Sequence, residues 1–250
     1  MTALQIKSCH YGIVFALGIE SGGLEDLLSG AIRIRGGGFC IKEGGLKGRR
    51  VVIIRSGAGR ENAARAAETL IDGHRPQVVI SAGFAGGLSP SLMRHDILSA
   101  DCVIDTSGRQ ININVQSMPS VPDWPGLRIG KLISVDHVVR ESSEKQSLYQ
   151  LHQALAVDME TFVVAEVCRR RDVPLFAVRI IHDTAGDILP PDVEHLLRQK
   201  SEAARLGAAL SAIWRRPASI KDLWAMKENS LIGSVHLAKF IAHLIEKQGA

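Results

Sequence analysis

Three carboxylates stand directly after apolar segments that the sequence predicts to be buried strands. Each follows its own segment: Glu20 comes after residues 11–17, Glu160 after 154–158 and Asp183 after 175–181. Open α/β folds bind ligands at the rim where their strands end, and carboxylates delivered there can transfer protons or bind hydroxyl groups. Taken singly, Glu20 and Glu160 could favour neighbouring helix N-termini, and Asp183 could cap a turn. The three together are more specific and indicate a small-molecule site.

A glycine-rich turn, Ser56–Gly59, follows another predicted strand and precedes a helix, so its amides could receive an anion. A dinucleotide fingerprint would need a third glycine where Asn62 stands and an acidic residue after the next strand, which ends in Ser81-Ala82-Gly83. The sequence contains no P-loop, no G-x-S-x-G elbow and no H-E-x-x-H motif. NAD, ATP held by a P-loop, serine hydrolysis and zinc proteolysis are therefore disfavoured.

Short apolar segments alternate with helical patterns, which indicates a mixed, mostly parallel sheet with helices on both faces. The clearest strands are expected at residues 11–17, 50–55, 77–82, 98–104, 127–135 and 175–181, and the clearest helices at 61–72 and 161–171. Residues 107–126, with three of the nine prolines, are expected to form an irregular connection. The predicted fold class is a three-layer α/β/α sandwich.

After two prolines at 190 and 191 the pattern becomes purely helical, with helices expected at residues 193–213, 220–228 and 231–246. The last of these has one apolar stripe that must dock on another element: Leu231, Val235, Ala238, Ile241 and Ile245. We therefore expect a helical C-terminal addition. Residues 1–250 are predicted to form one domain, with a core of about 11–213 and a tail of about 214–250.

Composition is that of a globular protein: 46% of the 250 residues are hydrophobic and 22% are charged. The longest apolar stretch, residues 13–19, is far below the roughly 20 residues that span a bilayer. Four scattered cysteines form no metal or redox motif, so a reducing cytoplasm is expected. The net charge of +4 is concentrated in the tail, since residues from Arg198 onward carry nine basic and four acidic side chains.

The chain resembles the nucleoside phosphorylase and nucleosidase superfamily, which includes methylthioadenosine/S-adenosylhomocysteine nucleosidases, over about residues 11–188. The resemblance depends on four blocks: GIVFALGIESGGL; SGAGRENA with SAGFAGGLSPSL; ISVDHVV; and AVDMET with VPLFAVRIIHDTAGD. The last is the most specific, because V-[ED]-M-E precedes R-x-x-x-D by some twenty residues. It implies cleavage of a ribose–adenine bond through an oxocarbenium-like state, in which the adenine leaves well only when N7 is protonated.

The resemblance also implies roles for individual residues. Asp183 matches the acid that protonates the leaving group, and burial would raise its pKa enough to hold the proton. Glu160 matches the carboxylate that binds the ribose 2′ and 3′ hydroxyls, and Glu20 matches the base that activates water. Met159 matches a methionine packed against sugar and base, although ordinary core packing explains it too. The backbone of Val138 and Val139 matches the positions that bind the purine edge.

The chain departs from the family pattern at three positions, two at the anion site and one beside the predicted acid, where it affects the hydrogen bonding around N7. Phe84, followed by Ala85 and Gly86, stands where a Ser or Thr usually contacts water or phosphate, and Ser81 stands where purine phosphorylases have an arginine. His182 replaces a small hydroxyl residue before the acid. Phosphate, the co-substrate of a phosphorylase, could still reach the water or anion site: Gly57, Gly59 and Arg60. The loss of two ligands favours hydrolysis, with no metal or organic cofactor.

The tail bears on substrate and partners. The turn at 189–191 and the segment Arg215-Arg216-Pro217 with Trp224 resemble the hopanoid-associated branch, whose substrate is adenosylhopane. A solvated basic helix explains the same residues. If the nucleoside carries a lipid, peripheral membrane contact through residues 217–227 is expected, with Trp214 and Trp224 near the boundary. Nucleic-acid binding is disfavoured because aromatic residues are not interleaved along a basic stripe.

The sequence thus predicts a cytoplasmic adenine-nucleoside N-glycosidase that releases adenine, as in methionine salvage, and that forms a homo-oligomer, preferably a dimer. One alternative is a purine nucleoside phosphorylase, for example one acting on adenosylhopane in hopanoid biosynthesis. An alternative of another class is a catalytically idle nucleoside-sensing module. The sequence leaves open the 5′ substituent of the nucleoside.

Overall fold

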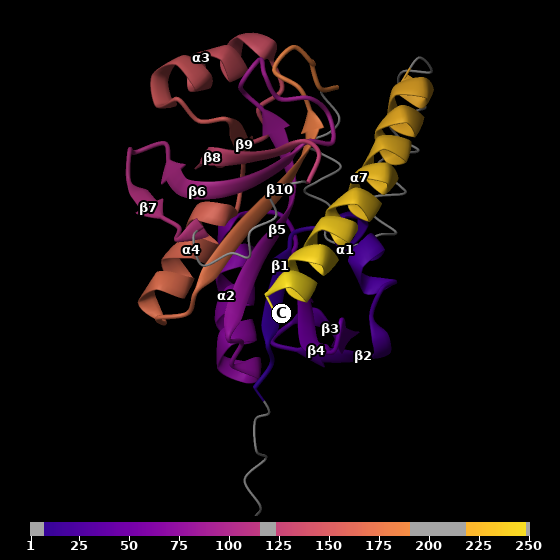
Figure 1. Cartoon of the computed structure of the whole chain (residues 1–250). Helices are drawn as coiled ribbons and strands as arrows, with labels where there is room; N and C mark the ends of the chain where they lie inside the picture. The colour runs from indigo at the N-terminus through magenta and orange to yellow at the C-terminus, as the bar shows by residue number, and fades with distance from the viewer. Residues whose placement is uncertain (1–7, 116–123, 191–218, 249–250) are drawn as a thin grey trace, which may run out of the picture.

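The structure is a computed structural model that describes residues 8–115, 124–190 and 219–248, with only the backbone given for residues 219–227. A ten-stranded sheet forms its centre (Figure 1). The elements follow in the order β1 (Tyr11–Phe15), α1 (Gly18–Glu25), β2 (Ser29–Gly36), β3 (Phe39–Leu46), β4 (Arg49–Arg55), α2 (Arg60–His74), β5 (Val78–Gly87), β6 (Ile97–Asp105), β7 (Gln110–Asn112), β8 (Leu127–Ser134), α3 (Ser142–His152), β9 (Ala156–Asp158), α4 (Thr161–Arg170), β10 (Leu175–Asp183) and α7 (Ser219–Lys247).

Strand β1 lies in the middle of the sheet, parallel to β4 on one side and to β5 on the other. An antiparallel hairpin of β2 and β3 extends the sheet beyond β4. On the other side, β5 pairs in parallel with β10 and antiparallel with β9. Strands β5, β10, β6, β8 and β9 close into a ring of pairings, which brings the ends of β5, β9 and β10 together.

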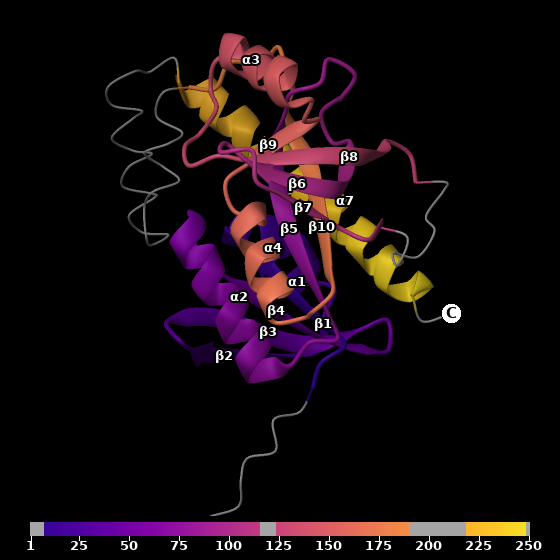
Figure 2. The same ribbon diagram turned by 90° about the vertical axis from the view of Figure 1, so that its left-hand side faces the viewer.

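Alternate residues of the central strands point into two different hydrophobic layers. Ile13 and Phe15 of β1 pack toward α1 and α7, whereas Val14 between them packs toward α2 and α4. Figure 2 shows α2 and α4 on the near side of the sheet and α7 behind it. This period of two is what a strand buried on both faces requires. The predicted α/β/α sandwich with a mixed sheet is confirmed.

Several elements differ from the sequence-based expectations. The hairpin of β2 and β3 and helices α1 and α3 were not predicted, and β7 forms a strand within the segment 107–126 that we expected to be irregular. The tail has one continuous helix, α7, where two helices were expected at 220–228 and 231–246. No proline or glycine stands between those two segments, so nothing in the sequence ends a helix there. The helix expected at 193–213 lies outside the described residues.

Helix α7 docks through its C-terminal half against the sheet and α1. Ala238, Ile241 and Ile245 of the predicted stripe are buried, but Leu231 and Val235 remain about half exposed. None of the helices in the described part of the chain combines the length and the apolar character needed to cross a membrane.

Candidate active site

A cavity of about 220 Å³ opens at the ends of β1, β5, β9 and β10. All three carboxylates and all seven predicted substrate-binding residues line it: Glu20, Glu160, Asp183, Met159, Val138, Val139, Phe84, Ala85, Gly86 and His182. The predicted anion site does not line it. Of the glycine-rich turn only Ala58 lines the cavity, and Gly57, Gly59 and Arg60 do not. Residues far apart in the sequence thus share one small-molecule pocket.

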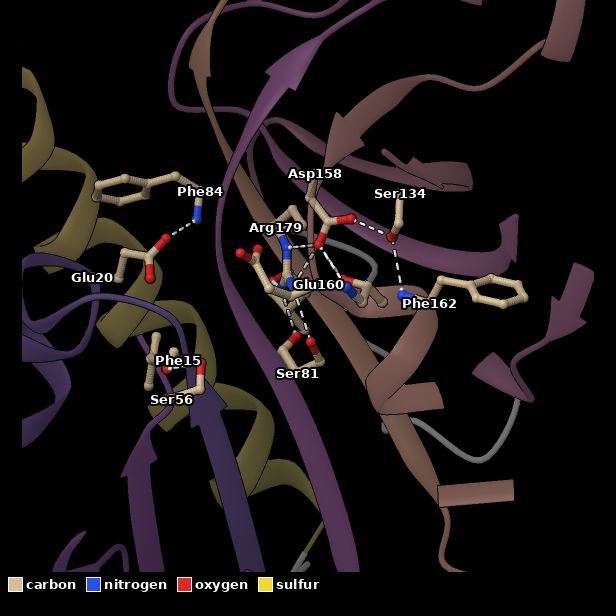
Figure 3. Close-up of polar contacts among 12 residues, drawn as sticks. Phe15, Glu20, Ser56, Ser81, Phe84, Ser134, Asp158, Glu160, Phe162 and Arg179 are labelled. Carbon is tan, nitrogen blue, oxygen red and sulfur yellow. Dashed lines mark hydrogen bonds and ion pairs between the residues drawn. The ribbon is translucent and has the colours of Figure 1, made fainter. Parts of the chain in front are cut away.

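Glu20 lies in the first turn of α1, where its carboxylate accepts two backbone hydrogen bonds. Oε2 accepts from the Leu17 N–H at 2.7 Å and Oε1 from the Phe84 N–H at 2.9 Å. The second bond links α1 to β5 (Figure 3). A side chain on Gly83 would bring its Cβ to 2.8 Å from Oε1, so this position requires glycine. Burial raises the pKa of Glu20, and the two N–H donors limit the rise.

Glu160 follows β9 and stands at the start of α4, half-buried in the pocket wall. Its Oε1 accepts a hydrogen bond of 2.8 Å from the N–H of Gly59, which caps the N-terminus of α2. Burial, followed by the nearby carboxylate of Asp158, raises the pKa of Glu160 to about 8. This environment favours the protonated form more than water does, whereas the resemblance implies an ionised carboxylate.

The amides predicted to hold an anion are already engaged within the protein. Gly59 donates to Glu160, and the Gly57 N–H donates to the carbonyl of Ala16 at 2.9 Å. A carboxylate of the protein thus occupies the helix N-terminus that could otherwise have received phosphate.

A buried polar network stands behind Glu160 and joins β10 to β5 and to the β9–α4 turn (Figure 3). The Arg179 guanidinium donates to Asp158 Oδ2 at 2.9 Å, to Ser81 Oγ at 2.9 Å and to the carbonyl oxygens of Ser81 and Val178. The Nε–H of Arg179 donates a further hydrogen bond to Asp158 Oδ2 at 3.1 Å. Together these hydrogen bonds engage all five N–H groups of the arginine. No N–H of Arg179 is left to bind a ligand.

Asp183 is the last residue of β10, and an irregularity in the pairing with β5 falls at His182 just before it. Its Oδ2 accepts a hydrogen bond of 2.5 Å from the Lys145 ammonium. Burial raises the pKa of Asp183, and the positive charge of Lys145 opposes part of that rise. A carboxyl whose pKa is raised in this way is suited to hold a proton and pass it to a bound ligand.

Phe84 and His182 form an aromatic wall of the cavity. Their rings stack with centroids 5.1 Å apart, and His182 Nε2 shares a 2.9 Å hydrogen bond with Ser230 Oγ of α7. The two residues that depart most from the family pattern therefore contact each other, and the phenyl ring lies where the pattern has a hydroxyl.

Several pocket features were not predicted from the sequence. Lys145 lies on a helix that the sequence did not indicate, and Ser230 and Leu189 reach the cavity from segments expected to have other roles. His137 also lines the cavity between the carboxylates of Asp136 and Glu144, whose hydrogen bonds raise its pKa. Within the described ranges, no three His, Cys, Asp or Glu side chains gather closely enough to hold a metal ion.

The fold and this pocket define an α/β protein with a buried acid–base site for a small polar molecule. Residues 11–124 and 121–215 match the family model described as the phosphorylase superfamily, and the chain belongs to that superfamily.

Curated relatives carry a more specific name. A 5′-methylthioadenosine/S-adenosylhomocysteine nucleosidase from Tolumonas auensis is 26% identical over 228 residues, 81% of this chain and 99% of the relative. A protein of the same name from Staphylococcus epidermidis is 29% identical over 165 residues, 57% of this chain and 72% of the relative.

Solved structures share the fold. The nucleosidase of that name from Neisseria meningitidis, in complex with methylthio-immucillin-A, has a TM-score of 0.69 and 19% identity, with 95% of this chain and 98% of the other covered. A Streptococcus pneumoniae MTA/SAH nucleosidase in complex with 8-aminoadenine has a TM-score of 0.74 and 16% identity, with 95% and 99% covered.

Proposed function

We propose that this protein hydrolyses the N-glycosidic bond of an adenine nucleoside and releases adenine. The observation that carries the proposal is the convergence of Glu20, Glu160 and Asp183 on one cavity from three separate sequence blocks. The names of the curated relatives support the same reaction class.

Each carboxylate has a distinct part in the proposed reaction. Asp183 gives its proton to adenine N7 as the C1′–N9 bond breaks. The electron pair of that bond moves onto the purine. Glu20 takes a proton from a water molecule that attacks C1′ of the oxocarbenium-like ribosyl group. Glu160 accepts hydrogen bonds from the ribose hydroxyls, and these O–H donors favour its ionised form. No step needs a metal or an organic cofactor.

Three features favour water over phosphate as the nucleophile. Phe84 has no hydroxyl for an anion, the amides of Gly57 and Gly59 donate to protein oxygens, and every N–H of Arg179 is engaged. An incoming phosphate would have to displace these bonds.

The test is to incubate the purified protein with 5′-methylthioadenosine, S-adenosylhomocysteine and adenosine, with and without phosphate, and to analyse the products. We expect adenine and the free sugar at equal rates in both buffers. Asp183→Asn should lower turnover by about 10² to 10⁴, the usual contribution of a general acid. Sugar 1-phosphate formed only with phosphate would identify a phosphorylase, and no adenine from any substrate would favour a nucleoside sensor.

Other features of the proposed function stay predictions. They are a cytoplasmic setting, assembly as a homodimer, one domain over the whole chain and the absence of nucleic acid as a partner. The expected membrane contact involves residues 217–227, whose side chains lie outside the described part of the structure, as does most of the segment that resembles the hopanoid-associated branch.

A further inference from the structure

Lys145 is a lysine with no exposed surface, located on α3 at the back of the pocket. Its ammonium has three N–H donors, and the structure gives it three acceptors. These are Asp183 Oδ2 at 2.5 Å and the backbone carbonyl oxygens of Thr184 and Asp187, both at 2.8 Å. A buried charge is tolerated only when it is paired and fully hydrogen-bonded, and this arrangement meets both conditions. The lysine is therefore held in one position.

The contact divides the two oxygens of Asp183 between two environments. Oδ2 faces the ammonium, whereas none of the hydrogen bonds in the described part of the structure ends on Oδ1. The side chain lines the cavity with only 8% of its surface exposed. Oδ1 is thus the oxygen left for a ligand, and the lysine fixes the rotation of the carboxyl group that presents it.

The proposed reaction creates a charge at this place. When Asp183 gives its proton to adenine N7, a neutral carboxyl becomes a carboxylate on a side chain with little exposure to water. An uncompensated buried carboxylate would be costly, and a fixed cation beside it stabilises the charge as it develops. The backbone oxygens of Thr184 and Asp187 keep the cation in place before the reaction begins.

We propose that Lys145 is a positioning residue for the leaving-group acid: it orients Asp183 and stabilises the carboxylate that proton transfer to adenine leaves behind. This inference rests on the proposed function. It adds to that function a residue that the sequence did not predict, and it makes α3 part of the site.

Other charged groups also face Asp183. His182 precedes it on β10, and Asp187 follows in the next loop, where Arg94 pairs with it at 2.8 Å. Both side chains are chemically unchanged when Lys145 is replaced, so the pH dependence of that variant measures the loss of the lysine's charge. Because its cation favours the ionised carboxyl, its removal should raise the pKa of Asp183.

Lys145→Met is the test, since methionine keeps most of the apolar stem and removes the charge. We expect kcat to fall about 10- to 100-fold at neutral pH, and the high-pH limb of kcat/KM to move up by about one pH unit or more, because Asp183 keeps its proton longer. Lys131→Met is the matched control. Lys131 donates to the carbonyl of His152 at the end of the same helix, at 3.0 Å, and does not contact Asp183. The Lys131→Met variant should have the high-pH limb of kcat/KM at the same pH as the wild type.

A purely structural role for Lys145 predicts a different result. The variant would then lose activity by the same factor at every pH. A high-pH limb of kcat/KM at the wild-type position would therefore overturn the proposal. If Lys145→Met does not fold, Lys145→Gln replaces it, because glutamine keeps two N–H donors for the carbonyl oxygens but has no charge. The same shift of the high-pH limb is expected for this variant. Failure of the proposed function is recognised separately, because the wild type would then release no adenine at any pH.

Discussion

Glu20 and Asp183 are buried and Glu160 is half-buried, and each carboxyl group has different partners. Glu20 accepts two backbone N–H groups, Glu160 accepts one and stands near Asp158, and Asp183 contacts a lysine. Burial raises the pKa of all three. Because the charged neighbours differ, the same chemical group can serve as base, hydroxyl acceptor and acid within one cavity.

The position of Glu160 leads to a prediction about sugar selectivity. Glu160→Gln keeps the size of the side chain and one carbonyl oxygen but cannot become a carboxylate. We expect kcat/KM for a ribonucleoside to fall by about 10-fold or more, and much less for its 2′-deoxy analogue, since hydrogen bonds to a charged acceptor are stronger than those to a neutral one. Steady-state kinetics on the two substrates measure the ratio. Equal losses would mean that Glu160 does not bind the sugar hydroxyls.

At the scale of elements, one ion pair connects most of the strands that form the pocket. Asp158 ends β9, accepts from Ser134 Oγ of β8 at 2.5 Å and from the Thr161 N–H at the start of α4, and pairs with Arg179 of β10. Arg179 in turn holds Ser81 of β5. The network fixes the β9–α4 turn, which carries Met159 and Glu160 into the cavity.

Arg179→Met should therefore destabilise the fold strongly. It removes the guanidinium and leaves the Asp158 carboxylate buried without its cation, a change that costs about 3 to 5 kcal/mol. Urea unfolding monitored by circular dichroism measures the loss. The matched control is Arg171→Met, because Arg171 pairs with Asp72 on the surface and such pairs contribute at most about 1 kcal/mol. Comparable losses in the two variants would contradict the role assigned to the buried pair.

The elements that could be predicted from the sequence are those with a regular apolar pattern. The strand expected at 98–104 is β6, and the helix expected at 61–72 is α2, whose buried alanines lie on one face. Helix α3 has no such pattern, since its one buried residue is the charged Lys145. The β2 strand was missed because its side chains are mostly exposed, Ile32 included, so it lacks the buried apolar face that marks a strand in the sequence.

The candidate site could be predicted where a motif names the residue, as with Glu20 and Asp183. The contact between Lys145 and Asp183 could not, because 38 residues separate them and only the packing of α3 beside the end of β10 brings them together. The same holds for Ser230 and His182, which are 48 residues apart. Pairings of this kind depend on the tertiary fold and leave no local signal in the sequence.

At the scale of the whole molecule, the C-terminal helix supports a residue of the N-terminal one. Helix α7 crosses α1 where Ser234 donates to the carbonyl of Glu20 at 3.1 Å and accepts from the Gly23 N–H at 3.0 Å. A Cβ on Gly23 would lie 2.7 Å from the backbone oxygen of Ser234, so the crossing is possible only with glycine there. The tail expected to be an added layer thus helps to position the predicted base.

Two neighbouring glycines of α1 allow this coupling to be tested. Gly23→Ala forces α1 and α7 apart, and we expect a lower thermal midpoint together with a fall in kcat/KM of about 10-fold or more as Glu20 shifts from its place beside the cavity. Gly22→Ala is the control, since a Cβ there has nothing within 4 Å. It should keep full activity and gain about 0.5 to 1 kcal/mol, because alanine is the better helix former. Thermal unfolding and steady-state kinetics on both variants decide the matter: if Gly23→Ala is as stable and as active as Gly22→Ala, the crossing of α7 over α1 does not hold Glu20 in position.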